Sequence, residues 1–292
     1  RTEEDIYKLA KSFRWEQYFT PKNTFKIELS SRRSPLKSVA FTALRVKDAV
    51  CDYFRETDGQ RPDVEKHDPD IRIYVHLTDK SCIIYLDTSG ESLFKRGWRE
   101  AKGEAPLKEN LAAGLLGLAG RTPDKPLQDP FCGSGTIPIE AALIAKNRAP
   151  GLNRTFSAQK WACVDKKLWL EAADEAMDKE FDGDDEIWGG DLDPQAVELA
   201  RHNAQLAEVD DIVRFEAADA RTFHWGGMYG RIVTNPPYGE RIMERREAEE
   251  LYRAFGKAWT KFPETWKLYL LSSHTEFERT FGKTADRKRK LY

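Results

Sequence analysis

Four consecutive residues, Asn235-Pro236-Pro237-Tyr238, combine a rigid backbone with groups that suit binding of a small planar molecule. Two prolines fix φ and remove two backbone donors, so this segment cannot lie inside a helix or a central strand. The preceding β-prone residues 231–233 place it at the end of a strand. The Asn235 amide oxygen and the Pro236 carbonyl can each accept an N–H, while the Tyr238 ring stacks on a heterocycle. The pattern indicates recognition of an exocyclic amino group, with a plain surface Pro-Pro turn as the alternative.

A second segment, residues 127–142, predicts a strand, a glycine turn and an alanine-rich helix whose first turn contains Pro138. Gly133 and Gly135 allow close approach of a ligand, and the helix N-terminus supplies donors for an anionic group. A dinucleotide-binding turn requires a third glycine near position 138, and a phosphate loop requires a lysine. We therefore expect a ligand that carries a carboxylate, such as the amino-acid end of S-adenosylmethionine. The candidate contacts here are Asp129, Phe131, Cys132, Gly133, Gly135 and Thr136.

Acidic residues follow two further expected strands. Asp191, next to Leu192, is the candidate for hydrogen-bonding a ribose diol, whereas Asp193 is expected to cap the helix that follows. Asp219, next to Ala220, is placed either to accept an adenine amino group or to cap the following turn. Ligands of doubly wound sheets bind where the strand order switches, at the carboxyl ends of the strands. We expect all these segments to meet there.

Length and composition bound the class of protein. The chain has 292 residues and a net charge of −2, with an acidic middle and mildly basic flanks that are compatible with RNA binding. It contains no apolar run of about 18 residues, so no membrane span is expected. The four cysteines and five histidines show no metal-binding or redox spacing, which favours a metal-free cytoplasmic protein. Because the chain starts at Arg1 without a methionine, we expect an N-terminally trimmed fragment.

The second half of the chain alternates strand and helix, which predicts a mostly parallel, doubly wound α/β sheet. The expected strands lie near 126–131, 186–191, 212–217, 231–235 and 266–272, and the helices near 136–147, 194–207, 247–261 and 275–281. The first part predicts a smaller α+β domain. Its elements are a helix at 3–13, a strand at 24–30, a helix capped by Ser34 or Ser38, and a hairpin of 71–77 with 82–86. Residues 148–185 are an insertion of no assigned function.

Between the halves, three cations surround a tryptophan. Lys95, Arg96 and Arg99 could contact phosphate while Trp98 stacks on a base. An ordinary linker with one buried tryptophan is an equal alternative.

These segments resemble the THUMP-containing 23S ribosomal RNA guanine-N2 methyltransferases. The resemblance is carried by residues 129–136, 191–193 and 235–241, together with 95–99 and 105–109. It implies an incomplete THUMP-like RNA-binding domain at 1–90, a linker at 91–103 and a Rossmann-like class I methyltransferase domain at 104–292. It also implies S-adenosylmethionine as cofactor and the 2-amino group of a guanosine in 23S RNA as acceptor, before full ribosome assembly. Arg241 is a further candidate RNA contact.

Other function classes compete with this interpretation. An amino-methyltransferase acting on transfer-RNA guanine, DNA adenine N6 or protein glutamine would use a similar Asn-Pro-Pro-Tyr segment. A non-catalytic RNA-binding or assembly factor would not need Asn235, Tyr238 and Asp191 intact. A nicotinamide-dependent oxidoreductase is disfavoured by Pro138. The sequence leaves the oligomeric state and the target nucleotide open.

Overall fold

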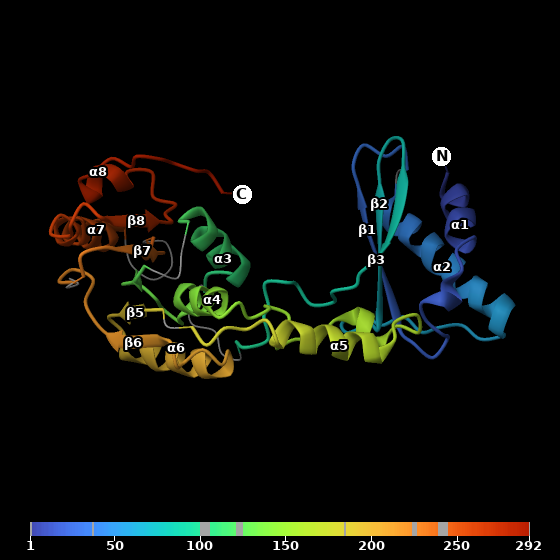
Figure 1. The fold of residues 1–292 in the computed structure, drawn as a ribbon. Coiled ribbons are helices and arrows are strands. Elements are labelled where there is room, and N and C mark those ends of the chain that lie inside the picture. The colour runs from blue at the N-terminus through green and yellow to red at the C-terminus, as the bar shows by residue number, and fades with distance from the viewer. Residues whose placement is uncertain are drawn as a thin grey trace. The chain divides into compact units, whose positions relative to one another are not determined.

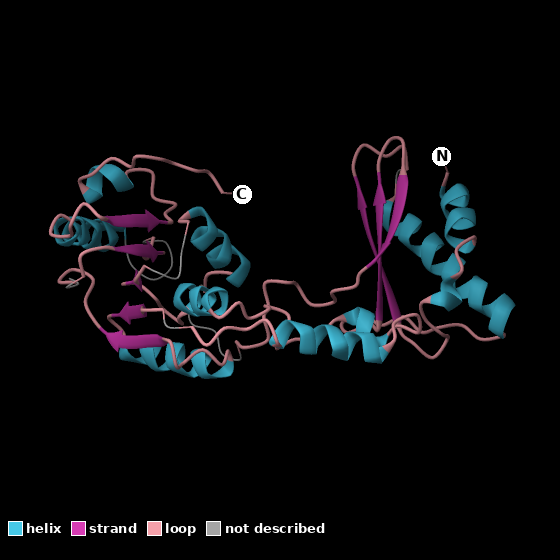
Figure 2. Cartoon of the chain, viewed as in Figure 1, coloured by secondary structure: helices cyan, strands magenta, loops and turns pink. Residues whose placement is uncertain are grey.

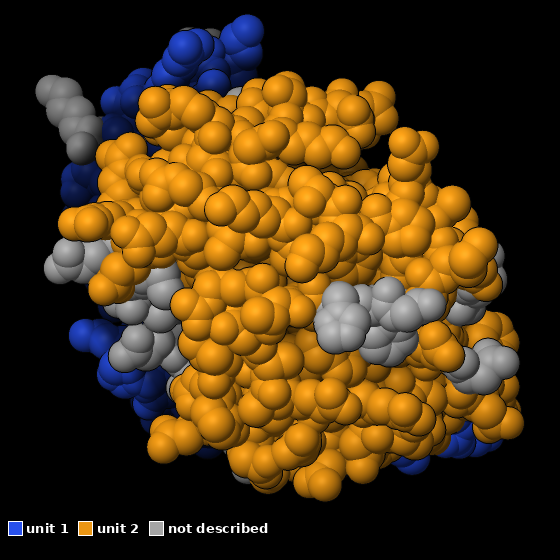
Figure 3. Space-filling model, turned by 90° about the vertical axis from the view of Figure 1, so that its left-hand side faces the viewer, with its two compact units in different colours: residues 1–92, 155–174 blue, residues 93–154, 175–292 orange. Residues whose placement is uncertain are grey.

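The computed structural model describes residues 2–36, 38–99, 106–120, 125–183, 185–223, 227–238 and 245–291. The chain forms two compact units, one of residues 1–92 with 155–174 and the other of residues 93–154 with 175–292 (Figure 3). None of the described helices combines the length and the apolar character that crossing a lipid bilayer requires.

The N-terminal unit is a three-stranded sheet with helices on one face (Figure 2). Strands β1 (Phe25–Ser31) and β2 (Ile71–Leu77) pair in parallel, and β2 pairs antiparallel with β3 (Cys82–Leu86), which confirms the expected hairpin. The helical elements are α1 (Glu3–Lys11), η1 (Trp15–Gln17) and α2 (Val39–Asp58). Ser38, rather than Ser34, caps α2 by accepting the Phe41 N–H. Alternate β2 side chains are buried beneath the helices, as a one-sided sheet requires.

Residues 155–174, within the stretch expected to be an insertion, complete this N-terminal core. They form η2 (Ser157–Lys160) and most of α5 (Lys166–Met177). Ala158 and Trp161 are buried in the same cluster as the sheet, and the Ala158 N–H donates to the Thr88 carbonyl at 3.1 Å. The segment therefore has a structural role that its Trp- and Lys-rich composition does not reveal.

The second unit is built on a five-stranded parallel sheet in the order β6-β5-β4-β7-β8, which confirms the expected doubly wound fold. Its strands are β4 (Leu127–Asp129), β5 (Ile187–Asp191), β6 (Val213–Ala217), β7 (Gly230–Thr234) and β8 (Trp266–Leu270). The chain leaves β4 toward β5 and β6 and then returns to the opposite side of β4 with β7. The switch in strand order therefore lies at β4, where a ligand crevice is expected.

Helices cover both faces of this sheet (Figure 1). Helices α3 (Glu109–Leu118), α4 (Thr136–Ala145) and α6 (Pro194–Leu206) pack on one face against Leu127, Ile187 and Val233. Helices α7 (Arg245–Trp259) and α8 (Phe277–Phe281) pack on the other. Neighbouring residues such as Ile187 and Trp188 belong to opposite cores, since successive side chains of a strand alternate between faces.

Candidate active site

The buried carboxylate of Asp129 connects the glycine turn to the strand that precedes Asn235. Asp129 ends β4 and is 1% exposed. Its Oδ1 accepts the Phe131 N–H at 3.1 Å and the hydroxyl of Thr234, the last residue of β7, at 2.5 Å. The turn after β4 and the Asn-Pro-Pro-Tyr corner after β7 therefore begin at one shared hydrogen-bonded point.

The two glycines of the turn serve different purposes. Both have positive φ, +50° at Gly133 and +84° at Gly135. A Cβ at Gly135 would lie 2.9 Å from the Phe215 ring and 3.0 Å from the Ala200 Cβ, so glycine is required there for packing. A Cβ at Gly133 would meet no described atom within 4 Å. Of the two, only Gly133 borders open space, so the expected close approach of a ligand applies to Gly133.

The end of β5 is fastened to the same turn. Asp191 accepts the Gly133 N–H on Oδ2 at 2.9 Å and the Asp193 N–H on Oδ1 at 3.0 Å. Each carboxylate oxygen retains a further lone pair that could accept a ribose hydroxyl. Leu192 beside it is 65% exposed, which leaves an apolar surface next to the acid. Asp193 caps α6 through the Gln195 N–H, as the sequence predicts.

Burial dominates the electrostatics of the turn. It raises the pKa of Asp129 to about 7, and the nearby Asp191 carboxylate raises it further, while hydrogen bonds from Thr234 and Phe131 oppose the shift. The Cys132 thiol is also buried, and its pKa lies well above the ordinary value. A thiol that stays protonated is a poor nucleophile, which agrees with a packing role for Cys132.

Two tyrosines hold the Asn-Pro-Pro-Tyr corner. The Tyr238 hydroxyl donates to the Asn235 amide oxygen, and the Tyr252 hydroxyl, from α7, donates to the Pro237 carbonyl at 2.5 Å. Burial raises the pKa of Tyr238, and that of Tyr252 to about 12, so both phenols remain donors near neutral pH. The sequence did not indicate that Asn235 and Tyr238 bind each other.

Asp219 has the geometry of a turn cap. Its carboxylate accepts the Arg221 backbone N–H at 2.9 Å and the Arg221 guanidinium at 2.6 Å. The Arg221 guanidinium accordingly holds the pKa of Asp219 below its ordinary range. The neighbouring Ala220 side chain is buried with Phe255 and Phe281. Of the two roles weighed for Asp219, the structure displays the capping role.

The cations expected to bind RNA are mostly engaged inside the protein. Trp98 is 2% exposed within the core, and Arg96 pairs with the buried Glu140 at 3.2 Å. The buried Arg99 pairs with Glu109 at 3.0 Å. The expectation that Arg96, Trp98 and Arg99 contact RNA is therefore wrong for this conformation, because these side chains fasten their segment to α3 and α4. The buried-tryptophan alternative is correct.

Arg99 also donates to the Thr136 hydroxyl at 2.5 Å, so this candidate cofactor contact already has a protein partner. Lys95 is exposed at the surface. Arg241 lies outside the described residues.

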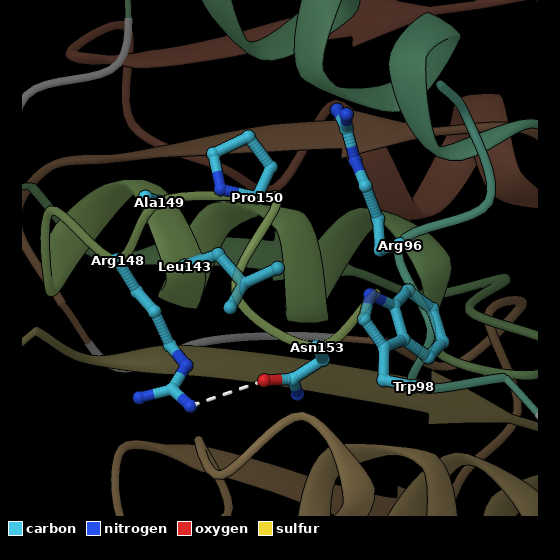
Figure 4. Close-up of a pocket in the computed structure, with 7 residues that line it drawn as sticks. All are labelled: Arg96, Trp98, Leu143, Arg148, Ala149, Pro150 and Asn153. Carbon is cyan, nitrogen blue, oxygen red and sulfur yellow. Dashed lines mark hydrogen bonds between the residues drawn. The ribbon is translucent and has the colours of Figure 1, made fainter. Parts of the chain in front are cut away.

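A small pocket near this segment is separate from the glycine turn. Its lining residues are Arg96, Trp98, Leu143, Arg148, Ala149, Pro150 and Asn153 (Figure 4). Arg148 is neutralised by Glu180 at 3.0 Å and Glu208 at 2.6 Å, as Arg96 is by Glu140. Because both cations are paired, the pocket lacks the charge of an anion site.

Three residues that position the site were missed by sequence reasoning: Thr234, Tyr252 and Asn203. The Asn203 amide donates to the Ser134 carbonyl at 3.0 Å and so braces the glycine turn from α6. A signal for Asn203 existed, since it is a polar residue on the buried stripe of α6 with Val197 and Ala200. Thr234 and Tyr252 carry no such signal, because their partners are distant in sequence.

This arrangement of strand order, glycine turn and diproline corner agrees with a family match. The model of the RMKL-like methyltransferase domain matches residues 96–292. The chain belongs to that family. A THUMP domain matches residues 1–87.

Relatives match across nearly the whole chain. YpsC of Bacillus subtilis (strain 168) is 37% identical over 100% of this chain and 76% of its own length. "Ribosomal RNA large subunit methyltransferase K/L" of Shewanella baltica (strain OS185) is 38% identical over 99% of this chain, which spans only 42% of that relative.

Solved structures of methyltransferases are similar to nearly the whole chain. A predicted N6-adenine-specific DNA methylase from Listeria monocytogenes str. 4b F2365 is 37% identical with a TM-score of 0.91, covering 99% of this chain and 76% of the other. SMU.472 complexed with SAH is 35% identical with a TM-score of 0.88, covering 100% of this chain and 78% of the other.

Proposed function

We propose that this protein transfers a methyl group from S-adenosylmethionine to the exocyclic 2-amino group of a guanosine in large-subunit ribosomal RNA. The observation that carries the proposal is the shared anchor of the two motifs. The Thr234 hydroxyl binds Asp129 at 2.5 Å, so the Asn-Pro-Pro-Tyr corner and the glycine turn adjoin at the switch point of one parallel sheet. Methyl transfer to an amine requires donor and acceptor sites in this proximity.

The residues around the turn fit the cofactor. Open space above Gly133, the partly free oxygens of Asp191 and the exposed Leu192 suit the amino-acid end, ribose diol and base of an adenosyl group. The buried Asp129, whose pKa is about 7, would be favoured as a carboxylate by an ammonium group. When bound, S-adenosylmethionine supplies a methyl group on a sulfonium centre. The SAH-bound relative supports this assignment, since SAH is the demethylated cofactor.

Asn235 and the Pro236 carbonyl are proposed to act on the nucleophile. A guanine 2-amino group is a poor nucleophile because its lone pair is shared with the ring. By accepting the two amino hydrogens, the Asn235 amide oxygen and the Pro236 carbonyl would favour a pyramidal nitrogen and stabilise the developing positive charge. The amide oxygen already accepts the Tyr238 hydroxyl and has a second lone pair for this purpose.

Tyr238 is proposed to hold the base by stacking, worth about 1–3 kcal/mol per base. A base in a helical region must first be extruded from its stack. The methylated nitrogen is acidic as it forms, so its proton can pass to solvent without a strong general base.

The names of the relatives and the THUMP domain support an RNA substrate, and the Asn-Pro-Pro-Tyr corner supports an amino acceptor. Lys95 and Arg241 are also proposed to contact RNA. An adenine 6-amino group presents the same two N–H donors, so the identity of the base must be measured directly.

The decisive experiment uses ribosomal RNA from cells that lack this protein, treated with the pure protein and S-adenosylmethionine, and analysed by nucleoside mass spectrometry. We expect N2-methylguanosine. N6-methyladenosine instead would overturn the guanine assignment. The Asn235→Ala variant should lose at least about 100-fold in kcat, as for loss of one charge-stabilising contact. Its affinity for S-adenosylmethionine should change little.

The variant Asn110→Ala, at an exposed position on α3 of the same unit, is the matched control and should keep full activity. Normal turnover by Asn235→Ala would refute the role given to that amide.

A further inference from the structure

The hydroxyl group of Tyr252 belongs to a fully buried side chain of the second unit. The side chain is 0% exposed, and its ring packs against Phe277 at 4.8 Å and His274 at 5.6 Å between centroids. Phe255, one turn further along α7, is equally buried and packs without any hydroxyl. Packing alone therefore does not require a tyrosine at position 252. A buried hydroxyl is costly unless it is hydrogen-bonded, so its partner is informative.

The hydroxyl donates to the Pro237 carbonyl at 2.5 Å and is also hydrogen-bonded to the Ser272 side chain. The Pro237 oxygen lies in the peptide plane that joins Pro237 to Tyr238. Proline already fixes φ at residues 236 and 237, so the main remaining freedom is rotation of that plane about ψ of Pro237. A donor on the buried face of α7 fixes this rotation and, with it, the start of the Tyr238 side chain.

The same contact distinguishes the two proline carbonyls of the corner. Tyr252 engages the Pro237 carbonyl, whereas no described residue donates to the Pro236 carbonyl. The oxygen left without a described partner is the one that the proposed function assigns to the amino group of the substrate.

We propose that Tyr252 is a positioning residue for methyl transfer, which orients the Asn-Pro-Pro-Tyr corner through the Pro237 carbonyl and never touches the substrate. The inference rests on the proposed function in requiring an amine acceptor, but not on which base supplies it. Because the phenol has a pKa of about 12, the hydrogen bond persists throughout the neutral range.

The test is Tyr252→Phe, which removes one oxygen atom and keeps the buried ring. We expect kcat to fall roughly tenfold, since small displacements of a reacting group are costly, while calorimetric affinity for S-adenosylmethionine stays within about twofold. The control is Tyr269→Phe on β8, a partly buried tyrosine that packs against the opposite core. It should retain wild-type kcat.

A second measurement separates positioning from loss of structure. If Tyr252 acts by placing Tyr238, then Tyr252→Phe should cost less than about twofold in kcat in a Tyr238→Ala background, because coupled residues are non-additive. A tenfold loss in both backgrounds, an unchanged kcat, or a parallel loss of cofactor affinity would each overturn the inference. Both kcat ratios are measured on whichever base the wild-type protein methylates, so a failed guanine assignment leaves this test intact.

Discussion

The buried carboxylate of Asp129 makes a pH-dependent prediction that can be worked out from the structure. Its pKa in the folded protein is about 7, above the ordinary value of 3.8. Between these pH values the folded protein keeps a proton that the unfolded chain releases, so stability falls as pH rises through this window. The two pKa values differ by about 3 units. At about 1.4 kcal/mol per unit, the free energy of unfolding falls by at most about 4 kcal/mol as pH rises through this window.

The substitution Asp129→Asn tests the cost of burying this carboxylate charge, because asparagine has nearly the same shape as aspartate. The Phe131 N–H and the Thr234 hydroxyl both donate to the same oxygen, Oδ1. An asparagine can present its amide oxygen to both donors, so the variant removes the charge and keeps the two hydrogen bonds. We expect the cofactor-free variant to be more stable than the wild type at pH 8, by an amount that shrinks toward pH 4.

Thermal unfolding from pH 4 to pH 8 measures this difference. At about 2–4 °C per kcal/mol, the advantage of the variant should reach several degrees at pH 8. A difference in Tm that does not change with pH, or a variant less stable at pH 8, would contradict the assigned burial cost. The proposed contact between Asp129 and the ammonium group of S-adenosylmethionine leads to a second expected result. From pH 5.5 to pH 7, wild-type affinity for S-adenosylmethionine should increase as Asp129 ionises, and the affinity of the variant should not.

The remaining predictions concern the walls of the proposed cofactor site. Gly133→Ala should fold with a stability loss of about 1 kcal/mol, owing to its positive φ, and bind S-adenosylmethionine at least about tenfold more weakly. Gly135→Ala should lose the same stability through its positive φ and about 1–3 kcal/mol more, because its Cβ would lie 2.9 Å from Phe215. Equal stability of the two variants in urea unfolding would contradict this distinction. Asp191→Ala should weaken cofactor binding about tenfold or more, through lost hydrogen bonds to a charged group, and unchanged affinity in calorimetry would exclude the ribose contact.

Local sequence rules determined the elements and the positions of the functional motifs. Proline restricts φ and glycine permits positive φ, so the corner at Asn235 and the turn at Gly133 could be placed at strand ends without coordinates. Strand and helix alternation gave the parallel sheet, and the order of motifs along the chain indicated where they meet. Asp193 was identified as a cap residue, and Ser38 as one of two candidates with Ser34, because capping depends on neighbours within a few positions.

Tertiary structure alone decided which groups are already engaged. Arg96 and Arg99 look like phosphate ligands in sequence, yet they pair with Glu140 and Glu109 on helices that follow later in the chain. Residues 155–174 complete the core of the N-terminal unit although more than sixty residues separate them from its strands. Tyr252 reaches the Pro237 carbonyl only because α7 packs on the face of the sheet that carries Leu268 and Leu270 of β8. Hydrogen bonds and ion pairs of this kind depend on distances between remote segments, which periodicity and composition do not encode.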